Sequence, residues 1–289
     1  MFNIETYNKV QSVSEAVTLL AENPRARVLA GGTDVLIRLR EGDDRYSQLI
    51  DIHDLAELQQ VQQLASGEIC IGAGVTFSQL MDNRLIQERL PLVAQAAGTV
   101  GGPQVRNVAT IGGNLCNGAI SADSAAALYV LDAVLEIEGV SGVRDLPIGE
   151  FYLGPGQVAL EHSDVLRAIR IPAASYRDYG THYYKYAMRN AMDIATIGCA
   201  AACKVKAGCF DTLKIAFTVA APKPMRARSA EQFSVGQAVT PALINEIAGL
   251  VLQDLNPRDS WRASKEFRLH IIKTLARRVI MAAAGVAEA

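Results

Sequence analysis

The stretch LAGGTDVL, residues 29–36, contains a glycine pair, and ATIGGNLCNGAISAD, residues 109–123, contains a second one. In each stretch a short apolar run leads into a glycine pair, and a helical pattern follows the pair. Such a turn presents bare backbone N–H groups at the start of a helix, where glycine permits close approach and an anion is favoured. A phosphate or a pyrophosphate is therefore the expected ligand of each turn.

Either glycine pair alone could be an ordinary structural turn, but two pairs together favour a larger ligand. A dinucleotide with a pyrophosphate and a ring system needs a long groove lined by loops from two subdomains. Thr110 and Asn114 add a hydroxyl and an amide near the second pair, and Asp123 could cap a helix or accept from a ribose hydroxyl. The two glycine pairs together therefore predict a dinucleotide cofactor. Because neither turn has the GxGxxG spacing, the doubly wound NAD-binding fold is not predicted.

Helical and strand-like patterns alternate through the N-terminal part of the chain. Residues 13–22 have apolar side chains at near-helical spacing, with Ser14 as a candidate N-cap. Residues 28–53 are βαβ-like, with the first glycine pair between a strand-like run and a helical face. Residues 69–71 predict a further strand, and Thr76 is a candidate cap for the helix that follows.

The C-terminal part has a different order. Residues 121–131 are alanine-rich and helical, and residues 173–181 are typical of a linker. Strand-like runs follow around residues 183–186, 197–205 and 213–219. The chain ends in helices, the last of which extends through Ala284 and has a predicted buried stripe made of Phe267, Ile271, Leu275 and Val279.

The composition excludes several classes of protein. The chain has 289 residues, 50% of them hydrophobic, and a formal net charge of −2. A sizeable core is therefore expected, whereas disorder and nucleic-acid binding are not. No run reaches about 18 apolar residues, so no membrane span is predicted. Five cysteines without a CxxC pair, and an amino terminus without a signal pattern, favour a reduced cytoplasmic protein without a zinc or iron–sulfur site.

Acid–base and nucleophilic candidates are few. No GxSxG, HExxH or Walker motif is present, and the scattered histidines are more readily structural: His53, His162, His182 and His270. Cys116, expected in a Gly/Asn loop, is either a thiol nucleophile or a small buried residue. Lys185, within YYKYAMR, either meets an anion or an electron-rich ring oxygen, or lies on an exposed edge strand. Backbone donors without acid–base groups suit a protein whose cofactor performs the chemistry, so no catalytic residue and no metal ligand is predicted.

The two glycine-containing segments, LAGGTDVL and GPQVRNVATIGGNLCNGAISAD, resemble the FAD-binding medium subunit of the molybdenum hydroxylases. This family includes bacterial xanthine dehydrogenase and carbon monoxide dehydrogenase. The resemblance continues through KYAMRNAMDIATIGCAA (residues 185–201) and SWRASKEFR (residues 260–268), and so covers nearly the whole chain. The last segment is most similar to the bacterial xanthine dehydrogenase branch.

The resemblance implies an α+β fold with two domains. Residues 1–175 would form the two-subdomain FAD-binding fold of the vanillyl-alcohol oxidase type, with subdomains at about 1–55 and 56–175. Residues 176–289 would form the family's small C-terminal domain, a sheet backed by helices.

The resemblance also implies which residues contact FAD. Two segments would wrap the pyrophosphate and the ribityl chain, and four further residues would adjoin them or contact the cofactor. These residues are Arg27, Val28, Leu29, Ala30, Gly31, Gly32, Thr33, Asp34, Ala109, Thr110, Ile111, Gly112, Gly113, Asn114, Asp123, Val165 and Lys185. The sequence departs from some relatives at Thr99-Val100-Gly101-Gly102, where they have a bulky aromatic residue that shields the flavin. The resemblance therefore does not imply that the flavin is shielded in this chain, nor that the flavin passes electrons to NAD+ in preference to dioxygen.

The implied function is electron transfer in a three-subunit oxidoreductase. A large molybdopterin subunit would oxidise a purine such as xanthine, a small subunit would relay electrons through two [2Fe–2S] clusters, and this chain would pass them from FAD to NAD+. No nucleic acid and no membrane would be involved. The alternatives are a self-sufficient flavin oxidase or reductase, a subunit serving another substrate such as CO, an aldehyde or an N-heterocycle, and a non-catalytic nucleotide-binding or assembly module.

Overall fold

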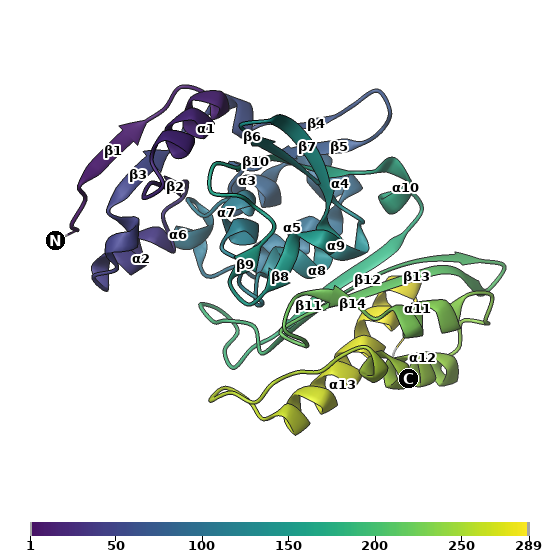
Figure 1. The fold of residues 1–289 in the computed structure, drawn as a ribbon. Helices are drawn as coiled ribbons and strands as arrows, with labels where there is room; N and C mark the ends of the chain where they lie inside the picture. The colour runs from purple at the N-terminus through teal and green to yellow at the C-terminus, as the bar shows by residue number, and fades with distance from the viewer. Residues whose placement is uncertain (1, 288–289) are drawn as a thin grey trace.

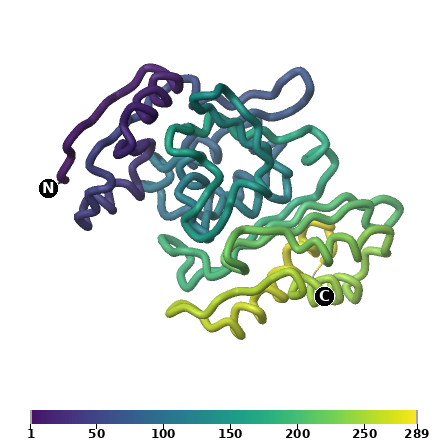
Figure 2. Tube along the Cα trace, viewed as in Figure 1, coloured from purple at the N-terminus to yellow at the C-terminus, as the bar shows by residue number. Residues whose placement is uncertain are grey.

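The computed structural model describes residues 2–287. The chain runs from an N-terminal unit at one side of the molecule, through a middle unit, to a C-terminal sheet and its helices (Figure 2). Each of the three has its own cluster of buried apolar side chains. Within the described residues, none of the helices is both long and apolar enough to span a membrane.

The N-terminal unit is a three-stranded parallel sheet in the order β1-β3-β2 (Figure 1). The chain leaves β2, turns through the first glycine pair into α2 and returns as β3, which confirms the predicted βαβ arrangement. Its elements are β1 (Thr6–Lys9), α1 (Val13–Glu22), β2 (Arg27–Leu29), α2 (Val35–Arg40), η1 (Asp44–Tyr46) and β3 (Gln48–Asp51).

Helix α1 has the predicted extent but a different cap. The Ser12 hydroxyl accepts a hydrogen bond from the Glu15 N–H at 3.1 Å, so the predicted cap, Ser14, is wrong and lies inside the helix. The apolar face of α1 is buried and contacts β3, β6 and β10. This helix therefore packs the N-terminal unit against the sheet of the middle unit.

The middle unit is a five-stranded antiparallel sheet in the order β4-β5-β10-β6-β7, with helices on one side (Figure 1). The strands are β4 (Val61–Gln63), β5 (Ile69–Gly72), β6 (Val134–Gly139), β7 (Gly142–Pro147) and β10 (Val165–Ile171). The other elements are η2 (Ala56–Leu58), α3 (Phe77–Asp82), α4 (Arg84–Arg89), α5 (Pro91–Gly98), α6 (Pro103–Arg106), α7 (Ile111–Cys116), α8 (Asp123–Val130), α9 (Ile148–Phe151), the β8–β9 hairpin (Tyr152–Gly154, Gln157–Val158) and α10 (Ala173–Tyr176). Thr76 caps α3 as predicted, in a capping box with Gln79.

The C-terminal part is a four-stranded antiparallel sheet in the order β11-β12-β13-β14. Helix α8 of the middle unit packs on one side of β12 and β13, and α13 packs against β11 and β12 (Figure 1). The elements are β11 (Gly180–Tyr186), β12 (Ile197–Lys206), β13 (Cys209–Thr218), β14 (Met225–Arg226), α11 (Arg228–Ser234), α12 (Pro241–Leu250), η3 (Val251–Gln253) and α13 (Lys265–Ala284).

Three further expectations are corrected. The linker predicted at residues 173–181 contains helix α10 and the start of β11. Phe267 does not belong to the buried stripe of α13, because it is 42% exposed and lies against the Tyr186 ring instead. Cys116 ends helix α7 and is not in a loop.

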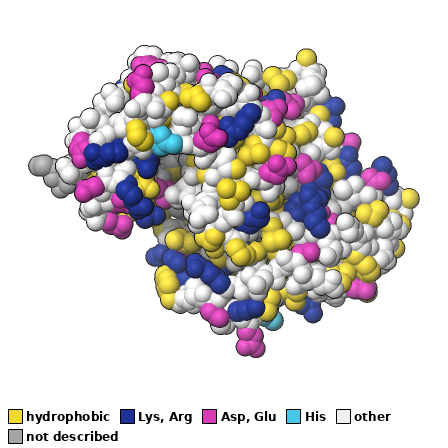
Figure 3. Space-filling model, viewed as in Figure 1, with side chains coloured by type: hydrophobic (Ala, Val, Ile, Leu, Met, Phe, Trp, Pro, Cys, Tyr) yellow, Lys and Arg dark blue, Asp and Glu magenta, His cyan; other side chains and the backbone are white. Residues whose placement is uncertain are grey.

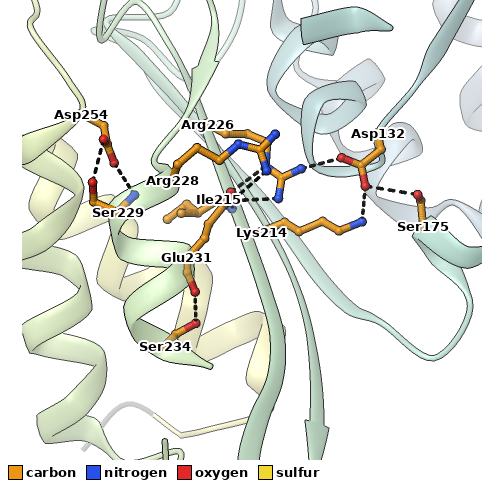
Figure 4. A network of polar contacts seen from close by, with 10 residues as sticks. All are labelled: Asp132, Ser175, Lys214, Ile215, Arg226, Arg228, Ser229, Glu231, Ser234 and Asp254. Atoms are coloured by element: carbon orange, nitrogen blue, oxygen red, sulfur yellow. Dashed lines mark hydrogen bonds and ion pairs between the residues drawn. The ribbon is translucent and has the colours of Figure 1, made fainter. Parts of the chain in front are cut away.

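Polar side chains join the middle unit to the C-terminal sheet (Figure 4). Asp132, just after α8, accepts from Lys214 on β13 and from Arg226 on β14. Both cations are nearly buried, and Arg226 also forms two hydrogen bonds to Glu231. Hydrophobic side chains, with Lys and Arg beside them, gather along this junction on the face shown in Figure 3. Asp132 is thus the anionic centre of the junction.

Asp132→Asn is expected to destabilise the chain by about 1–3 kcal/mol, because two nearly buried cations lose their shared counter-charge. Asparagine tolerates the positive φ of 47° at this position, so the backbone conformation is retained. Urea unfolding measures the change. Asp211→Asn, which breaks the exposed pair with Lys206, should cost less than about 1 kcal/mol. Equal losses in the two variants would contradict the role given to Asp132.

Candidate cofactor-binding cavity

A cavity of about 670 Å³ lies between the N-terminal unit and the middle unit, within the size range of small-molecule sites. Its walls are the turn after β2, the first turn of α7 and the segment leading into β10. The predicted site residues that line it are Arg27, Val28, Ala30, Gly31, Gly32, Thr33, Asp34, Ala109, Thr110, Gly112, Gly113, Asn114 and Val165. Four others do not line it: Leu29, Ile111, Asp123 and Lys185.

The turn after β2 offers free backbone donors to the cavity. Within residues 2–287, no hydrogen bond engages the N–H groups of residues 31–35. Gly32 has a φ of +71°, which glycine adopts without strain. A run of unpaired N–H groups around such a residue is suited to hold an anion.

The second glycine pair differs from the prediction. The Gly112 N–H donates to the Ala73 carbonyl oxygen at 2.9 Å, and the Gly113 N–H donates to Thr110 Oγ1 at 3.0 Å. A Cβ at Gly112 would lie 2.6 Å from both the Cβ and the carbonyl oxygen of Ala73. The expectation of bare N–H groups here is therefore wrong, because these donors are used within the chain. Gly112 permits close packing of α7, and Gly112→Val would disturb that packing directly.

Contacts join the two glycine segments although they are far apart in the sequence. A Cβ at Gly31 would lie 1.9 Å from the Val108 carbonyl oxygen, so the backbones touch at this point. The Asn117 amide donates to Asp34 Oδ1 at 3.1 Å. Burial raises the pKa of Asp34, and this outweighs the opposite effects of Arg38 and Asn117. The two segments consequently line one cavity.

Asp123 and Lys185 lie immediately behind the cavity wall. Lys185 Nζ donates to Asp123 Oδ2 at 2.7 Å and to the Thr99 carbonyl oxygen at 2.9 Å, and both side chains are nearly buried. Val100, which follows Thr99, and Ser124, which follows Asp123, connect the ion pair to the cavity wall. Val100 lines the cavity, and the Ser124 hydroxyl donates to Asn114 Oδ1 at 2.7 Å. Lys185 is therefore not an exposed edge-strand lysine; it meets an anion.

The Asp123 carboxylate has a raised pKa. Desolvation raises its pKa to about 6, although Lys185 and Tyr183 act in the opposite direction. The alternative of a plain N-cap is wrong, because the N-cap of α8 is Ala122 and no side chain caps this helix. The carboxylate of Asp123 therefore pairs with Lys185 and does not cap helix α8.

The raised pKa of Asp123 predicts a pH-dependent stability. Because the pKa of the Asp123 carboxyl is higher in the folded chain than in the unfolded chain, protonation of this group stabilises the folded chain. This contribution to the free energy of unfolding is complete below about pH 4 and is lost as the pH rises through about 6. Relative to Asp123→Asn, which cannot titrate, the wild type should lose on the order of 2–3 kcal/mol between pH 4 and pH 7. Parallel denaturant titrations of the two proteins measure this. A constant difference across that pH range would contradict the prediction.

Sequence reasoning missed one wall of the cavity and did not predict that His162 and Cys116 line it. The β8–β9 hairpin and the segment before β10 add Gly156, Val158, Leu160, Glu161, His162 and Asp164. His162 was expected to be structural, yet it lines the cavity, with Nδ1 3.3 Å from Arg27 Nη1. Cys116 also lines it, but burial raises its thiol pKa to about 12, so it stays protonated and is no nucleophile at neutral pH.

Comparisons with known proteins place the chain in a family. Residues 2–174 match the FAD binding domain in molybdopterin dehydrogenase, and residues 182–283 match the CO dehydrogenase flavoprotein C-terminal domain. The chain belongs to the FAD-binding medium subunits of the molybdenum hydroxylases, which confirms the resemblance and the predicted α+β fold. It is an oxidoreductase component of a multi-subunit enzyme, of the xanthine dehydrogenase-like kind.

Individual relatives cover almost all of the chain. It is 48% identical over 287 residues to the xanthine dehydrogenase FAD-binding subunit of Escherichia coli O157:H7, covering 99% of this chain and 98% of the relative. It is 31% identical to the carbon monoxide dehydrogenase medium chain of Hydrogenophaga pseudoflava, covering 96% of each. The solved carbon monoxide dehydrogenase from Hydrogenophaga pseudoflava superimposes with a TM-score of 0.94 over 99% of both chains. Quinoline 2-oxidoreductase from Pseudomonas putida 86 superimposes with a TM-score of 0.92, covering 99% of this chain and 98% of the other.

Proposed function

We propose that the cavity holds FAD, with the pyrophosphate at residues 31–35 and the ring system toward Val100 and Lys185. The observation that carries this proposal is one cavity walled by two glycine segments from separate units, one of them with free backbone donors. Gly113, Thr110 and Asn114 offer close approach, a hydroxyl and an amide at the opposite wall. These features fit the cofactor expected from the family.

We further propose that the chain carries electrons from [2Fe–2S] clusters on a small partner subunit to NAD+. FAD, when bound, supplies the redox chemistry, taking up electrons singly and releasing them as a pair. The chain's own residues would bind and orient the cofactor and exclude water from it. The names of the relatives, medium chain and FAD-binding subunit, support separate molybdopterin and cluster subunits, as in a heterotrimer.

The substrate of the assembled enzyme is proposed to be a purine such as xanthine. The support is the 48% identity to a xanthine dehydrogenase subunit, against 31% to a carbon monoxide dehydrogenase medium chain. The five free cysteines are consistent with a reducing compartment such as the cytoplasm.

Three measurements on purified protein test these proposals in order. Denaturing the full chain should release about one FAD per chain, and NADH should bleach the bound flavin without oxygen. The complex copurified with its partner subunits should reduce NAD+ with xanthine. A chain that binds no added FAD would overturn the cofactor assignment. Bleaching by xanthine in the isolated chain would favour a self-sufficient flavin enzyme, and a complex active only with CO or an aldehyde would overturn the substrate assignment.

A further inference from the structure

Exposed apolar side chains gather where the loop between β11 and β12 meets the segment before α13. Trp261 is 79% exposed and Met188 is 66% exposed, the two highest fractions among the exposed large apolar side chains of residues 2–287. The same loop and the start of α13 add three more exposed apolar side chains: Met192, Ile194 and Phe267. An exposed apolar patch of this kind marks a surface that binds another molecule.

Contacts from α13 hold the loop and the segment side by side. The Thr196 N–H donates to the Tyr186 carbonyl oxygen at 2.8 Å and so closes the loop 187–195. Arg268 donates to the Thr196 carbonyl oxygen and, at 2.8 Å, to Ser260 Oγ. Both parts extend from the same end of the C-terminal sheet and its helices (Figure 1). The exposed side chains therefore belong to one surface.

This surface has an excess of positive charge. Residues 256–268 contain four basic side chains and two acidic ones. In the described part of the chain, no carboxylate lies within ion-pair distance of Arg258, Arg262 or Arg268. Burial lowers the pKa of Arg268, and Arg258 and Arg262 lower it further, against a smaller opposite effect of Asp259. Neighbouring guanidinium groups without a carboxylate partner are suited to receive anionic groups from another molecule.

The residue types of this surface fit a protein partner. The Arg262 guanidinium lies over the Trp261 ring, with its central carbon 4.1 Å from the ring centroid. Trp, Met and Arg are enriched at protein–protein interfaces, and Trp and Arg are enriched among the residues that contribute most to binding. A partner that presents carboxylates around an apolar patch would match both the charge and the apolar side chains.

The loop 187–195 also packs against the cavity wall, at the end proposed to hold the ring system. The Met192 N–H donates to the Gly101 carbonyl oxygen at 3.2 Å, and a Cβ at Gly102 would lie 2.4 Å from Met192 Sδ. Gly101 follows Val100, which lines the cavity. A protein bound over this loop would therefore lie next to the wall behind which the ring system is proposed. A subunit that delivers electrons to the ring has to bind close to it.

We propose that this surface binds the partner subunit that carries the [2Fe–2S] clusters. Carboxylates of that subunit pair with Arg258 and Arg262, and its apolar side chains pack on Trp261 and Met188. The inference rests on the proposed function, from which it takes both the cluster-bearing subunit and the position of the ring system.

Binding of the purified small [2Fe–2S] subunit to the full chain, measured by biolayer interferometry, tests the proposal. Trp261→Ala should weaken binding about thirtyfold, as for a central interface tryptophan. Arg258→Glu combined with Arg262→Glu should weaken it at least tenfold. It should also remove most of the salt dependence of the wild type, because salt screens the attraction between charges. Val235→Ala and Arg89→Glu are matched controls at other exposed positions and should leave affinity unchanged.

A photo-cross-linking amino acid in place of Met188 tests which subunit binds. In the assembled complex it should attach to the small subunit, and attachment only to the molybdopterin subunit or to a second copy of this chain would overturn the proposal. Unchanged affinity in Trp261→Ala and in the double arginine variant would do the same. A changed affinity for NADH in these variants would indicate a dinucleotide site at the surface instead of a docking surface.

The FAD content of the isolated variants separates this inference from the cofactor assignment. None of the substituted residues lines the cavity, so each variant should release as much FAD as the wild type when denatured. Because that measurement needs no partner, a chain without FAD would contradict the proposed function. Normal FAD content with unaltered binding of the small subunit would contradict the docking surface alone.

Discussion

Gly31→Ala is expected to abolish FAD binding at micromolar cofactor concentrations and to lower Tm by several degrees. The added Cβ would lie 1.9 Å from the Val108 carbonyl oxygen and 2.6 Å from its carbon, far inside contact distance. Both atoms belong to backbone, so no side chain can move aside, and the two cavity walls must separate. Moving both walls should cost at least about 3 kcal/mol, or a hundredfold in affinity. Equilibrium dialysis and thermal melts measure the two effects.

Gly249→Ala is the matched control for this change. Gly249 lies within α12, and a Cβ there would meet nothing within 4 Å. The substitution should leave FAD affinity unchanged and stabilise the helix by up to about 1 kcal/mol. If Gly31→Ala retained wild-type affinity, the first glycine turn would not be part of the cofactor site.

The fold around the first glycine pair could be predicted because local periodicity and turn chemistry agree there. Helix α1 was placed correctly, but Ser12 and Ser14 both suit an N-cap, and only the hydrogen bond to Glu15 distinguishes them. Helix α7 was missed because a six-residue helix that contains Gly112 and Gly113 has the composition of a loop. Its stability comes from packing against Ala73, which the sequence does not reveal.

The sequence showed which segments form the candidate site, but not which of their residues contact one another. Sequence alone singled out Asp123 as a helix cap or an acceptor from a ribose hydroxyl, and Lys185 as a cation within a run of aromatic residues. Their pairing depends on α8 packing against the C-terminal sheet, an arrangement of distant elements. His162 gave no local signal, since only the tertiary fold brings its loop beside Arg27. The Gly112 N–H was assigned to a ligand because spacing cannot show that Ala73 already accepts it.

Lys185→Met should destabilise the chain by about 3–5 kcal/mol, the usual result of leaving one partner of a buried ion pair uncompensated. Asp123 would remain almost fully buried, and loss of the cation would raise its pKa further above about 6. The destabilisation should therefore be smaller at pH 5, where the carboxyl is protonated, than at pH 8. Denaturant titrations at the two pH values measure it.

Two further variants decide whether the pair itself is responsible. Lys273→Met removes the same charge from an exposed position on α13 and should change stability by less than about 0.5 kcal/mol at either pH. Lys185→Met combined with Asp123→Asn should recover part of the loss, because no unpaired carboxylate remains. If the double variant were as unstable as the sum of its single changes, Lys185 and Asp123 would be energetically independent. The Asp123 carboxylate would then not require Lys185, and the ammonium behind the cavity wall would lose its anchor.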